Sequence, residues 1–352
     1  MISKISNVRI KGISCAIPSN ITTVEELNQG RYSENELNDL ISATGTNTLY
    51  HAKENQTSSD LCYEASIKLL VDIGWEKDEI DALIFISQTP DYILPATSFV
   101  LHNRLNLSKN CLVLDINLGC SAYIYGLFLA GQLLSSGSCK KLLLLVGDTL
   151  SKAISREDYS VSLIFSDGGS ATALEYANDS PQMTFVINSN GLGTDHLIIP
   201  AGGFRQPKDH LTAIPSTDQY GNSRTKENLF MNGMEIFMFS IREIPTLINN
   251  VVKEHGWIST DVDKYLFHQA SLIIMHNIAK KAKLPLDKIP INIGTYGNTS
   301  GVSIPLLICD KYSENELSFP LNIVMAGFGV GLSWGALSMT MDNILCSDIL
   351  FV

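Results

Sequence analysis

The chain has 352 residues, 45% of them hydrophobic and 17% charged, which is enough apolar material for one large or two medium globular domains. This composition excludes an intrinsically disordered chain, a collagen and a small disulfide scaffold. The formal net charge of −11 argues against nucleic-acid binding through the phosphates, unless a local basic patch overrides the total.

Cysteine usage and the N-terminal segment bear on the compartment. Seven scattered cysteines form no CxxC pair, so they fit neither a zinc site nor a disulfide framework and favour a reducing, cytoplasmic setting. The first ten residues lack a secretion signal, and no stretch reaches the roughly 18 apolar residues of a membrane span. We therefore expect a soluble intracellular protein that binds neither membrane nor nucleic acid.

The order of apolar runs and helical patterns predicts an α/β protein. Short apolar runs predict buried strands at 82–86, 111–116, 142–146, 161–165, 265–267 and 321–326. Helical patterns lie between several of them, at 60–73, 121–134 and 234–255, and the first has its N-cap at Ser58 or Ser59. Residues 201–227 have no sustained period and predict a long surface loop.

Cys120 is the first candidate for chemistry. It follows the strand at 111–116 through a Leu118-Gly119 turn and opens a helix that is apolar on more than one face, and therefore buried. The positive end of a helix dipole lowers the pKa of a thiol, which favours a nucleophile. The alternative is an inert cysteine, because free cysteines are among the most buried residues.

Other polar or glycine-rich segments follow predicted strands. His268 lies at the carboxyl end of the strand at 265–267, where α/β sheets build their sites, although a lone histidine there is also typical of a structural role. Asn298 lies in a glycine-flanked turn. Residues 327–331 could direct backbone N–H groups at an oxyanion, but they form no dinucleotide fingerprint because residue 332 is leucine. We interpret residues 167–169 as a structural turn.

Motifs for other chemistries are missing from the sequence. There is no GxxxxGK[ST], HExxH, GxSxG or EF-hand pattern, so ATP, zinc and serine-hydrolase chemistry have no sequence support. We expect no metal and no resident cofactor.

Seven motifs, spread over nearly the whole chain, occur in the order found in the β-ketoacyl-acyl-carrier-protein synthase III family of the thiolase-like superfamily, which this sequence resembles. They are TPDYILPATS (89–98), DINLGCSAY (115–123), FSDGGSA (165–171), NGMEIFMFSI (232–241), FHQAS (267–271), GNTSGVSIP (297–305) and GFGVGLSWG (327–335). The resemblance implies a five-layered α-β-α-β-α fold built from two duplicated βαβ-rich halves, normally as a homodimer. Residues 1–180 would carry the nucleophilic cysteine, and residues 181–352 the histidine and asparagine.

The resemblance also implies the roles of individual residues. The nucleophile matches Cys120, and the histidine and asparagine that act on the second substrate match His268 and Asn298. Backbone N–H groups of Cys120 and Val330 would form the oxyanion hole, although the family usually has glycine at the second position. Thiolases need a second catalytic cysteine near the C-terminal glycine loop, and Cys346 lies beyond it.

Substrate contacts are implied in the same way. The pocket would include Leu94 and Pro95, which shape it across the dimer interface, together with Phe328 and Gly329. The substrates would be acyl-CoA or acyl-carrier protein, whose phosphopantetheine arm enters the site.

The surface that would dock the acidic carrier protein keeps Lys280 and Lys281, but Met238 and Ile273 replace basic residues of the family. Asn47, Leu49 and Tyr159 stand where many members have arginines near the nucleotide, and Ser271 replaces an asparagine beside the histidine. The lost cations predict a weakened affinity for CoA, unless nearby lysines or arginines compensate.

Three functions remain open at this point. The first is a condensing enzyme like 3-oxoacyl-[acyl-carrier-protein] synthase III, in fatty acid or specialised acyl biosynthesis: Cys120 takes an acyl group from a thioester, and a decarboxylative Claisen condensation with malonyl-carrier protein follows. The second is an acyltransferase of the same fold that passes the acyl group to a hydroxyl or amine without condensation. The third is a non-catalytic scaffold, against which the intact cysteine, histidine and asparagine argue.

Overall fold

The structure is a computed structural model that describes residues 1–178, 180–313 and 320–352. Two β-sheets form its framework. The larger sheet has the strand order β17-β2-β8-β7-β5-β6, and β18 also pairs with β2. Its strands are β2 (Val8–Ile17), β5 (Ala82–Ile86), β6 (Leu112–Ile116), β7 (Lys141–Asp148), β8 (Gly168–Tyr176), β17 (Leu345–Cys346) and β18 (Leu350–Phe351).

The smaller sheet has the strand order β1-β9-β16-β15-β14. Its strands are β1 (Ile2–Ile5), β9 (Met183–Ser189), β14 (Lys264–Phe267), β15 (Leu321–Gly329) and β16 (Ser333–Met341). The pairs β5–β6, β5–β7 and β14–β15 are parallel, and they supply the carboxyl ends at which the candidate residues lie.

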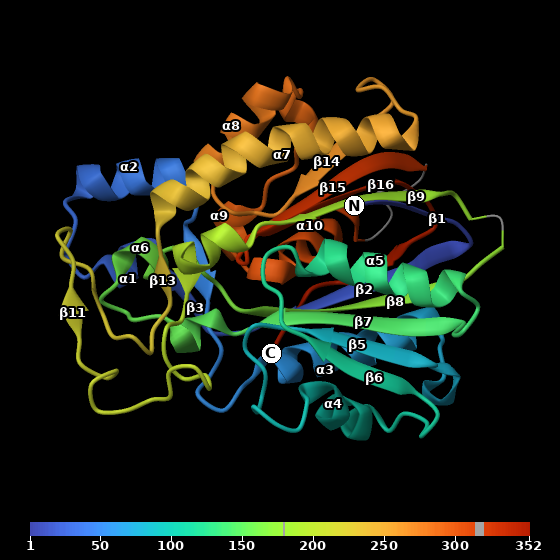
Figure 1. Ribbon diagram of the computed structural model, residues 1–352, viewed down its shortest axis with the longest axis horizontal. Helices are drawn as coiled ribbons and strands as arrows, with labels where there is room; N and C mark the ends of the chain where they lie inside the picture. The colour runs from blue at the N-terminus through green and yellow to red at the C-terminus, as the bar shows by residue number, and fades with distance from the viewer. Residues whose placement is uncertain (179, 314–319) are drawn as a thin grey trace.

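Helices cover both sheets and fill the space between them, in five layers (Figure 1). The helices α3 (Ser58–Ile73) and α4 (Thr97–Leu105) lie on the outer face of the larger sheet, and α7 (Gly233–His255) and α8 (Leu272–Ala282) lie outside the smaller one. Between the sheets lie α5 (Ala122–Ser135) and α10 (Ser303–Tyr312). The α-β-α-β-α architecture expected from the sequence is thereby confirmed.

The central helix α5 is buried because its sequence is apolar on nearly every face. Ile124 and Leu127 belong to one core cluster with Leu144 of β7 and Phe185 of β9, so this helix packs against both sheets through apolar contacts. Gly126 permits the close approach, because a Cβ there would lie 2.7 Å from the side chain of Leu144.

Short elements connect the layers around the site. They are β3 (Ile21–Thr23), α1 (Val24–Asn28), α2 (Glu34–Thr44), β4 (Thr48–Tyr50), α6 (Tyr159–Ser162), β10 (Leu197–Ile198), β13 (Phe230–Met231) and α9 (Ile293–Tyr296). The predicted surface loop at 201–227 is largely irregular and contains only the two-residue strands β11 (Ser216–Thr217) and β12 (Ser223–Arg224).

Both ends of the chain cross to the sheet of the other half. The N-terminal strand β1 pairs with β9 in the smaller sheet, and the C-terminal strands β17 and β18 pair with β2 in the larger sheet. The division into halves at residue 180 stays a prediction. Within the described residues, no helix is long and apolar enough to cross a membrane.

Three local predictions are wrong. Residues 161–165, predicted as a strand, contain the end of α6, because the Asp158 side chain accepts a hydrogen bond from the Ser160 N–H and caps a helical turn there. Residues 168 and 169, predicted as a turn, begin β8. The helix predicted from residue 60 begins at Ser58, with Thr57 as its N-cap.

Gly169 provides a test of how closely α3 packs on β8. A Cβ at Gly169 would lie 2.6 Å from the Cys62 backbone nitrogen and the Leu61 Cβ, so Gly169→Ala must push α3 off the sheet. We expect this substitution to lower the free energy of unfolding by about 2–3 kcal/mol, as overpacked cores do. Urea denaturation measures the change, and Gly203→Ala, which meets nothing within 4 Å, is the control. Equal midpoints for the two variants would contradict the packing described here.

Candidate active site

Cys120 lies at the N-terminal end of α5, between the two sheets, and is 7% exposed. Its neighbours approach closely because they have no side chains. A Cβ at Gly329 would lie 2.7 Å from the Cys120 Cβ and 3.0 Å from its Sγ, and a Cβ at Gly327 would lie 3.0 Å from the Cys120 carbonyl oxygen. The glycines that follow the strand at 321–326 therefore make room for the sulfur, and β15 extends through Gly329.

His268 follows β14 and is 2% exposed. Its Nδ1 lies 2.7 Å from the Ser303 Oγ, and its ring packs edge-on against Phe328. The Gln269 backbone N–H donates to the same Ser303 oxygen at 3.4 Å, and the Ser300 backbone is a further hydrogen-bond partner of the imidazole. In the tautomer in which Nδ1 accepts from the Ser303 hydroxyl, the ring proton resides on Nε2 and is the one that a substrate oxygen could accept.

The Asn298 side chain is held at both ends. Its Oδ1 accepts a hydrogen bond from the Ser300 N–H at 2.9 Å, and its Nδ2 donates to the Ala270 carbonyl at 3.3 Å. One hydrogen of the amide nitrogen is left for a ligand. The backbone of Asn298 also forms an isolated parallel β-bridge with Phe165, which links the turn around Asn298 to the segment before β8.

These three side chains line one cavity of about 200 Å³. Its other walls are mostly apolar and come from α2, α7, α8, β10, β13, β15 and the segment before β8. They include Ala43, Thr44, Ile164, Phe165, Leu197, Met231, Gly233, Ile236, Phe237, Ala270, Ser271, Ile273, Ile274, Phe328 and Gly329. The structure thus brings together Cys120, His268 and Asn298 from three separate segments, with Phe328 and Gly329 beside them.

The two backbone N–H groups expected to bind an oxyanion are free. Neither the Cys120 nor the Val330 N–H donates to the backbone or side chain of another described residue. Val330 itself lines a neighbouring cavity and its carbonyl accepts a hydrogen bond from the Ser333 Oγ at 2.8 Å. Its role in the oxyanion hole stays a prediction.

Burial favours the neutral forms of both titratable groups. Burial raises the pKa of Cys120 to about 12, opposed by a hydrogen bond from Ser300. Burial likewise lowers the pKa of His268 to about 3. The sequence-based prediction that the helix dipole lowers the thiol pKa is therefore wrong for the enzyme without substrate, because desolvation outweighs it.

Some departures from the family pattern have a structural reason. Leu49 is fully buried in a small apolar cluster with Leu37 and Tyr159, so both positions belong to the core rather than to an anion site. The Arg31 guanidinium lies 4.6 Å above the Tyr159 ring and donates to the backbone carbonyls at 220 and 221. Asn47 packs beside Gly294.

The remaining predicted residues lie on the surface of the single chain. Leu94 is 78% exposed and Pro95 is exposed too, and neither lines the cavity that contains Cys120. Lys280 and Lys281 are exposed near the C-terminal end of α8. Ser271 is the N-cap of α8 and accepts a hydrogen bond from the Ile274 N–H, and it also lines the cavity.

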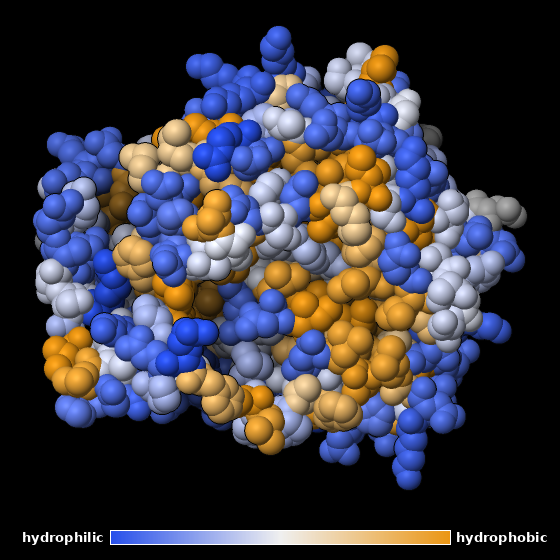
Figure 2. Space-filling model, in the orientation of Figure 1, coloured by the Kyte–Doolittle hydropathy of each residue, from blue (hydrophilic) through white to orange (hydrophobic). Residues whose placement is uncertain are grey.

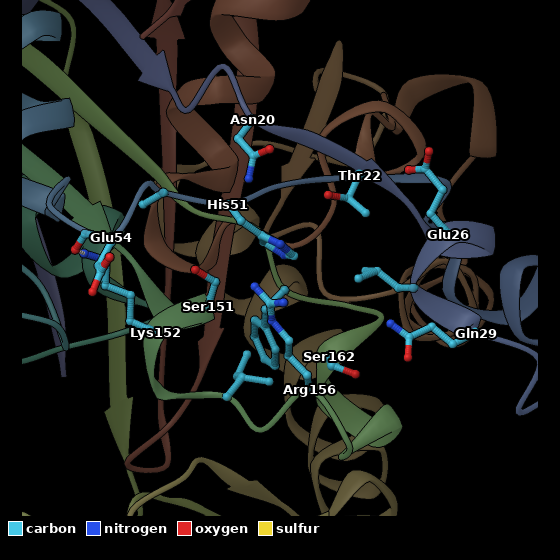
Figure 3. Close-up of a pocket in the computed structure, with 14 residues that line it drawn as sticks. Asn20, Thr22, Glu26, Gln29, His51, Glu54, Ser151, Lys152, Arg156 and Ser162 are labelled. Atoms are coloured by element: carbon cyan, nitrogen blue, oxygen red, sulfur yellow. Dashed lines mark hydrogen bonds between the residues drawn. The ribbon is translucent and has the colours of Figure 1, made fainter.

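Phe165 also lines a second, larger cavity of about 570 Å³. Figure 3 shows the residues that line this second cavity. Polar side chains dominate it, and His51 lies directly over Arg156 at its centre. It contains none of the three candidate catalytic side chains. Among the described residues, no group of three or more His, Cys, Asp or Glu side chains could hold a metal ion.

Sequence reasoning missed the side chains that contact the candidate catalytic residues. Ser300 lies 3.8 Å from the Cys120 sulfur, and Ser303 holds His268. Both serines lie in the motif at 297–305, so their closeness to Asn298 in the sequence could have indicated that they lie at the site. Asp148 and Gln88 carry no such signal, because they reach Ser300 from the end of β7 and from the segment after β5, which are distant in the sequence.

A buried cysteine, a neutral histidine and an asparagine in one apolar cavity, inside two packed sheets of this topology, define a thiolase-fold acyltransferase. Residues 114–191 match the family model of 3-oxoacyl-[acyl-carrier-protein (ACP)] synthase III, and residues 252–341 match the model of its C-terminal part. The chain belongs to this family of condensing enzymes, as its relatives show.

Three relatives illustrate the similarity. The β-ketoacyl-[acyl-carrier-protein] synthase III of Clostridium perfringens strain SM101 is 33% identical, over 94% of this chain and 98% of its own. The crystal structure of 3-oxoacyl-(acyl-carrier protein) synthase from Burkholderia xenovorans LB400 is 40% identical with a TM-score of 0.93, covering 100% and 99% of the two chains. The synthase III structure from Pseudomonas aeruginosa PAO1 is 25% identical with a TM-score of 0.81, covering 96% and 99%.

The lowered pKa of His268 predicts a pH-dependent stability. Its ordinary pKa is about 6.5, so the unfolded chain binds the proton more tightly, and the stability contributed by neutral His268 is lost as the pH falls from about 6.5 towards 3. Between pH 7.5 and 4.5, the free energy of unfolding of wild type should fall by about 3 kcal/mol more than that of His268→Gln. Denaturant titrations at both pH values measure this difference. The exposed His276 is the control: His276→Gln should track wild type, and a His268→Gln curve parallel to wild type would contradict the prediction.

Proposed function

We propose that this protein forms a 3-oxoacyl thioester by condensing an acyl group, carried on Cys120, with malonyl-carrier protein. The main observation behind this proposal is that Cys120, His268 and Asn298 line the same cavity. In the loading step the Cys120 thiolate attacks the carbonyl carbon of an acyl thioester, and the CoA or carrier thiol leaves. The acyl group is then held as a thioester on the enzyme.

The second step uses the two donors on the other side of the cavity. His268 Nε2–H and the free Asn298 amide hydrogen would bind the thioester carbonyl of the malonyl group. As CO₂ leaves, its bonding electrons form an enolate, whose oxygen these hydrogen bonds stabilise. The enolate carbon attacks the acyl carbon, and the Cys120 thiolate leaves. Burial favours the neutral form of the imidazole. A neutral imidazole can donate this hydrogen bond without forming an ion pair with the malonyl carboxylate.

Mass spectrometry of the intact protein tests this proposal. Wild type mixed with a panel of acyl-CoAs and acyl-carrier proteins should gain one acyl group, and malonyl-carrier protein should discharge it as a product two carbons longer with release of CO₂. Cys120→Ala should gain no acyl group. His268→Ala and Asn298→Ala should still be loaded but condense about 10²–10³-fold more slowly.

Each other outcome contradicts a defined part of the proposal. An acyl-enzyme that malonyl-carrier protein cannot discharge would favour acyl transfer to a hydroxyl or amine instead. Absence of any adduct would favour a non-catalytic scaffold. Failure of His268→Ala to load would assign the imidazole to the first step.

The carrier protein would approach along α7 and α8. Lys280 and Lys281 supply cations there, while Met238 and Ile273 present exposed apolar side chains closer to the cavity. This surface fits a carrier that contributes both carboxylates and apolar side chains. The phosphopantetheine arm of the substrate would supply the reacting thioester, with no resident cofactor. A cytoplasmic location stays a prediction.

We further propose a homodimer that forms along β6. This strand is the edge of the larger sheet, and hydrophobic residues gather over α5 and the strands beneath it on the face shown in Figure 2. Tyr92, Ile93, Leu94, Phe99 and Leu112 are exposed apolar residues on β6, on α4 and on the loop before it. A second copy would cover an edge that otherwise risks aggregation, and would bring Leu94 to the acyl pocket of its partner.

Leu112→Glu tests this interface with little effect on the single chain, because the Leu112 side chain is 50% exposed. We expect wild type to elute as a dimer in size-exclusion chromatography with light scattering and the variant to be mainly monomeric. Ile258→Glu, at an exposed apolar position beyond the end of α7, is the matched control and should remain dimeric. A dimeric Leu112→Glu protein would place the interface elsewhere.

A further inference from the structure

The buried polar chain that ends at the Cys120 sulfur has no part in the roles described so far. Its first link is Ser300, whose Oγ lies 3.8 Å from Cys120 Sγ and which is completely buried. The second link is the Gln88 side-chain amide, and the third is the Asp148 carboxyl group at the end of β7. These residues come from three distant segments, yet each touches the next.

The direction of the hydrogen bonds in this chain follows from its fixed end. The Asp148 carboxylate accepts from the Gln88 backbone N–H at 2.8 Å and from the Ser87 hydroxyl at 3.2 Å. Gln88 Nε2 donates to the other carboxylate oxygen at 3.1 Å. The opposite orientation of the amide would place its oxygen against a carboxylate, which repels it, so the nitrogen must face Asp148.

The same amide nitrogen lies 3.2 Å from Ser300 Oγ. Because it has no lone pair to offer, the Ser300 oxygen is the acceptor in this bond. The Ser300 hydroxyl hydrogen then has two acceptors within reach, the Asp148 carboxylate and the Cys120 sulfur, and its hydrogen bonds lower the pKa of both groups. A donor in this position stabilises a thiolate more than a thiol, since hydrogen bonds to charged groups are the stronger ones.

The surrounding backbone is shaped to hold this arrangement. Ser300 has a φ of +53°, in the left-handed region that favours glycine, and its N–H is bound by the Asn298 side chain. Gly119 is required on the other side, because a Cβ there would lie 2.5 Å from the atoms of the Gln88 amide. A non-glycine residue in this conformation persists only when its neighbours hold it.

We propose that Ser300 donates a hydrogen bond to the Cys120 thiolate when this thiolate forms, and that Gln88, oriented by Asp148, is a positioning residue that holds the Ser300 oxygen beside the sulfur. The inference rests on the proposed nucleophilic role of Cys120 but not on which acyl donor or acceptor is used. The hydrogen bond from Ser300 offsets part of the free-energy cost of forming a thiolate in a buried site, where the thiol form is otherwise favoured.

The test is the rate of alkylation of Cys120 by iodoacetamide between pH 7 and 10, followed by peptide mass spectrometry. Below the thiol pKa this rate is proportional to the thiolate fraction. Ser300→Ala should react about 10-fold more slowly than wild type at each pH, because the charged form loses its donor. Gln88→Met, which keeps the length of the side chain but loses the amide, should slow the reaction in the same direction.

The double variant separates positioning from a structural effect. If Gln88 acts through Ser300, then Gln88→Met combined with Ser300→Ala should react no more slowly than Ser300→Ala alone. Ser338→Ala removes another completely buried serine hydroxyl, in β16 and without a hydrogen-bond partner, and should match wild type. Circular dichroism confirms that each variant is folded.

Two results would overturn the proposal: a Ser300→Ala profile that superimposes on wild type, or rate losses that simply multiply in the double variant. The assay needs no acyl donor, so it is independent of whether condensation occurs. A protein that fails to condense but shows the expected alkylation profile would refute the proposed function alone.

Discussion

The site depends on the contact of backbone segments from three distant parts of the chain, without side chains between them. A Cβ at Gly301 would lie 2.9 Å from the Gly119 carbonyl oxygen, and Gly327 and Gly329 press against Cys120 itself. This contact closes the space between the two sheets at the start of α5. The sulfur is largely buried as a result, and the electrostatics of the site follow from that burial.

Burial of Cys120 and His268 sets the charge state of the enzyme before substrate binds. Desolvation disfavours both the thiolate and the imidazolium, so Cys120 and His268 are both neutral before substrate enters. Charge then arises only during the reaction, first on the sulfur and later on the enolate oxygen. Groups that are already oriented, such as Ser300 near the sulfur and Asn298 opposite it, lower the cost of that charge because they need not reorganise.

Much of this arrangement could be predicted from the sequence. Residues 82–86 form a strand as expected, because a continuous apolar run between polar residues has few other stable environments. Cys120 and His268 were found by their places after strands. The direction of the Cys120 pKa shift was not, since it depends on the whole surroundings rather than on one helix. The contacts of Gln88 and Asp148 leave no local pattern, because strand order alone brings them together.

The crossing of the chain ends has a kinetic consequence. Strand β1 pairs with β9, which lies about 180 residues further along the chain, and β2 pairs with β17 and β18, which lie between residues 345 and 351. Such pairings have a high contact order and form late, because a long loop must close before they gain any stability. During synthesis, the larger sheet therefore lacks its strands β17 and β18 until residues 345–351 have emerged. The two halves are in this sense tied together at both ends, and unfolding one of them exposes strand edges of the other.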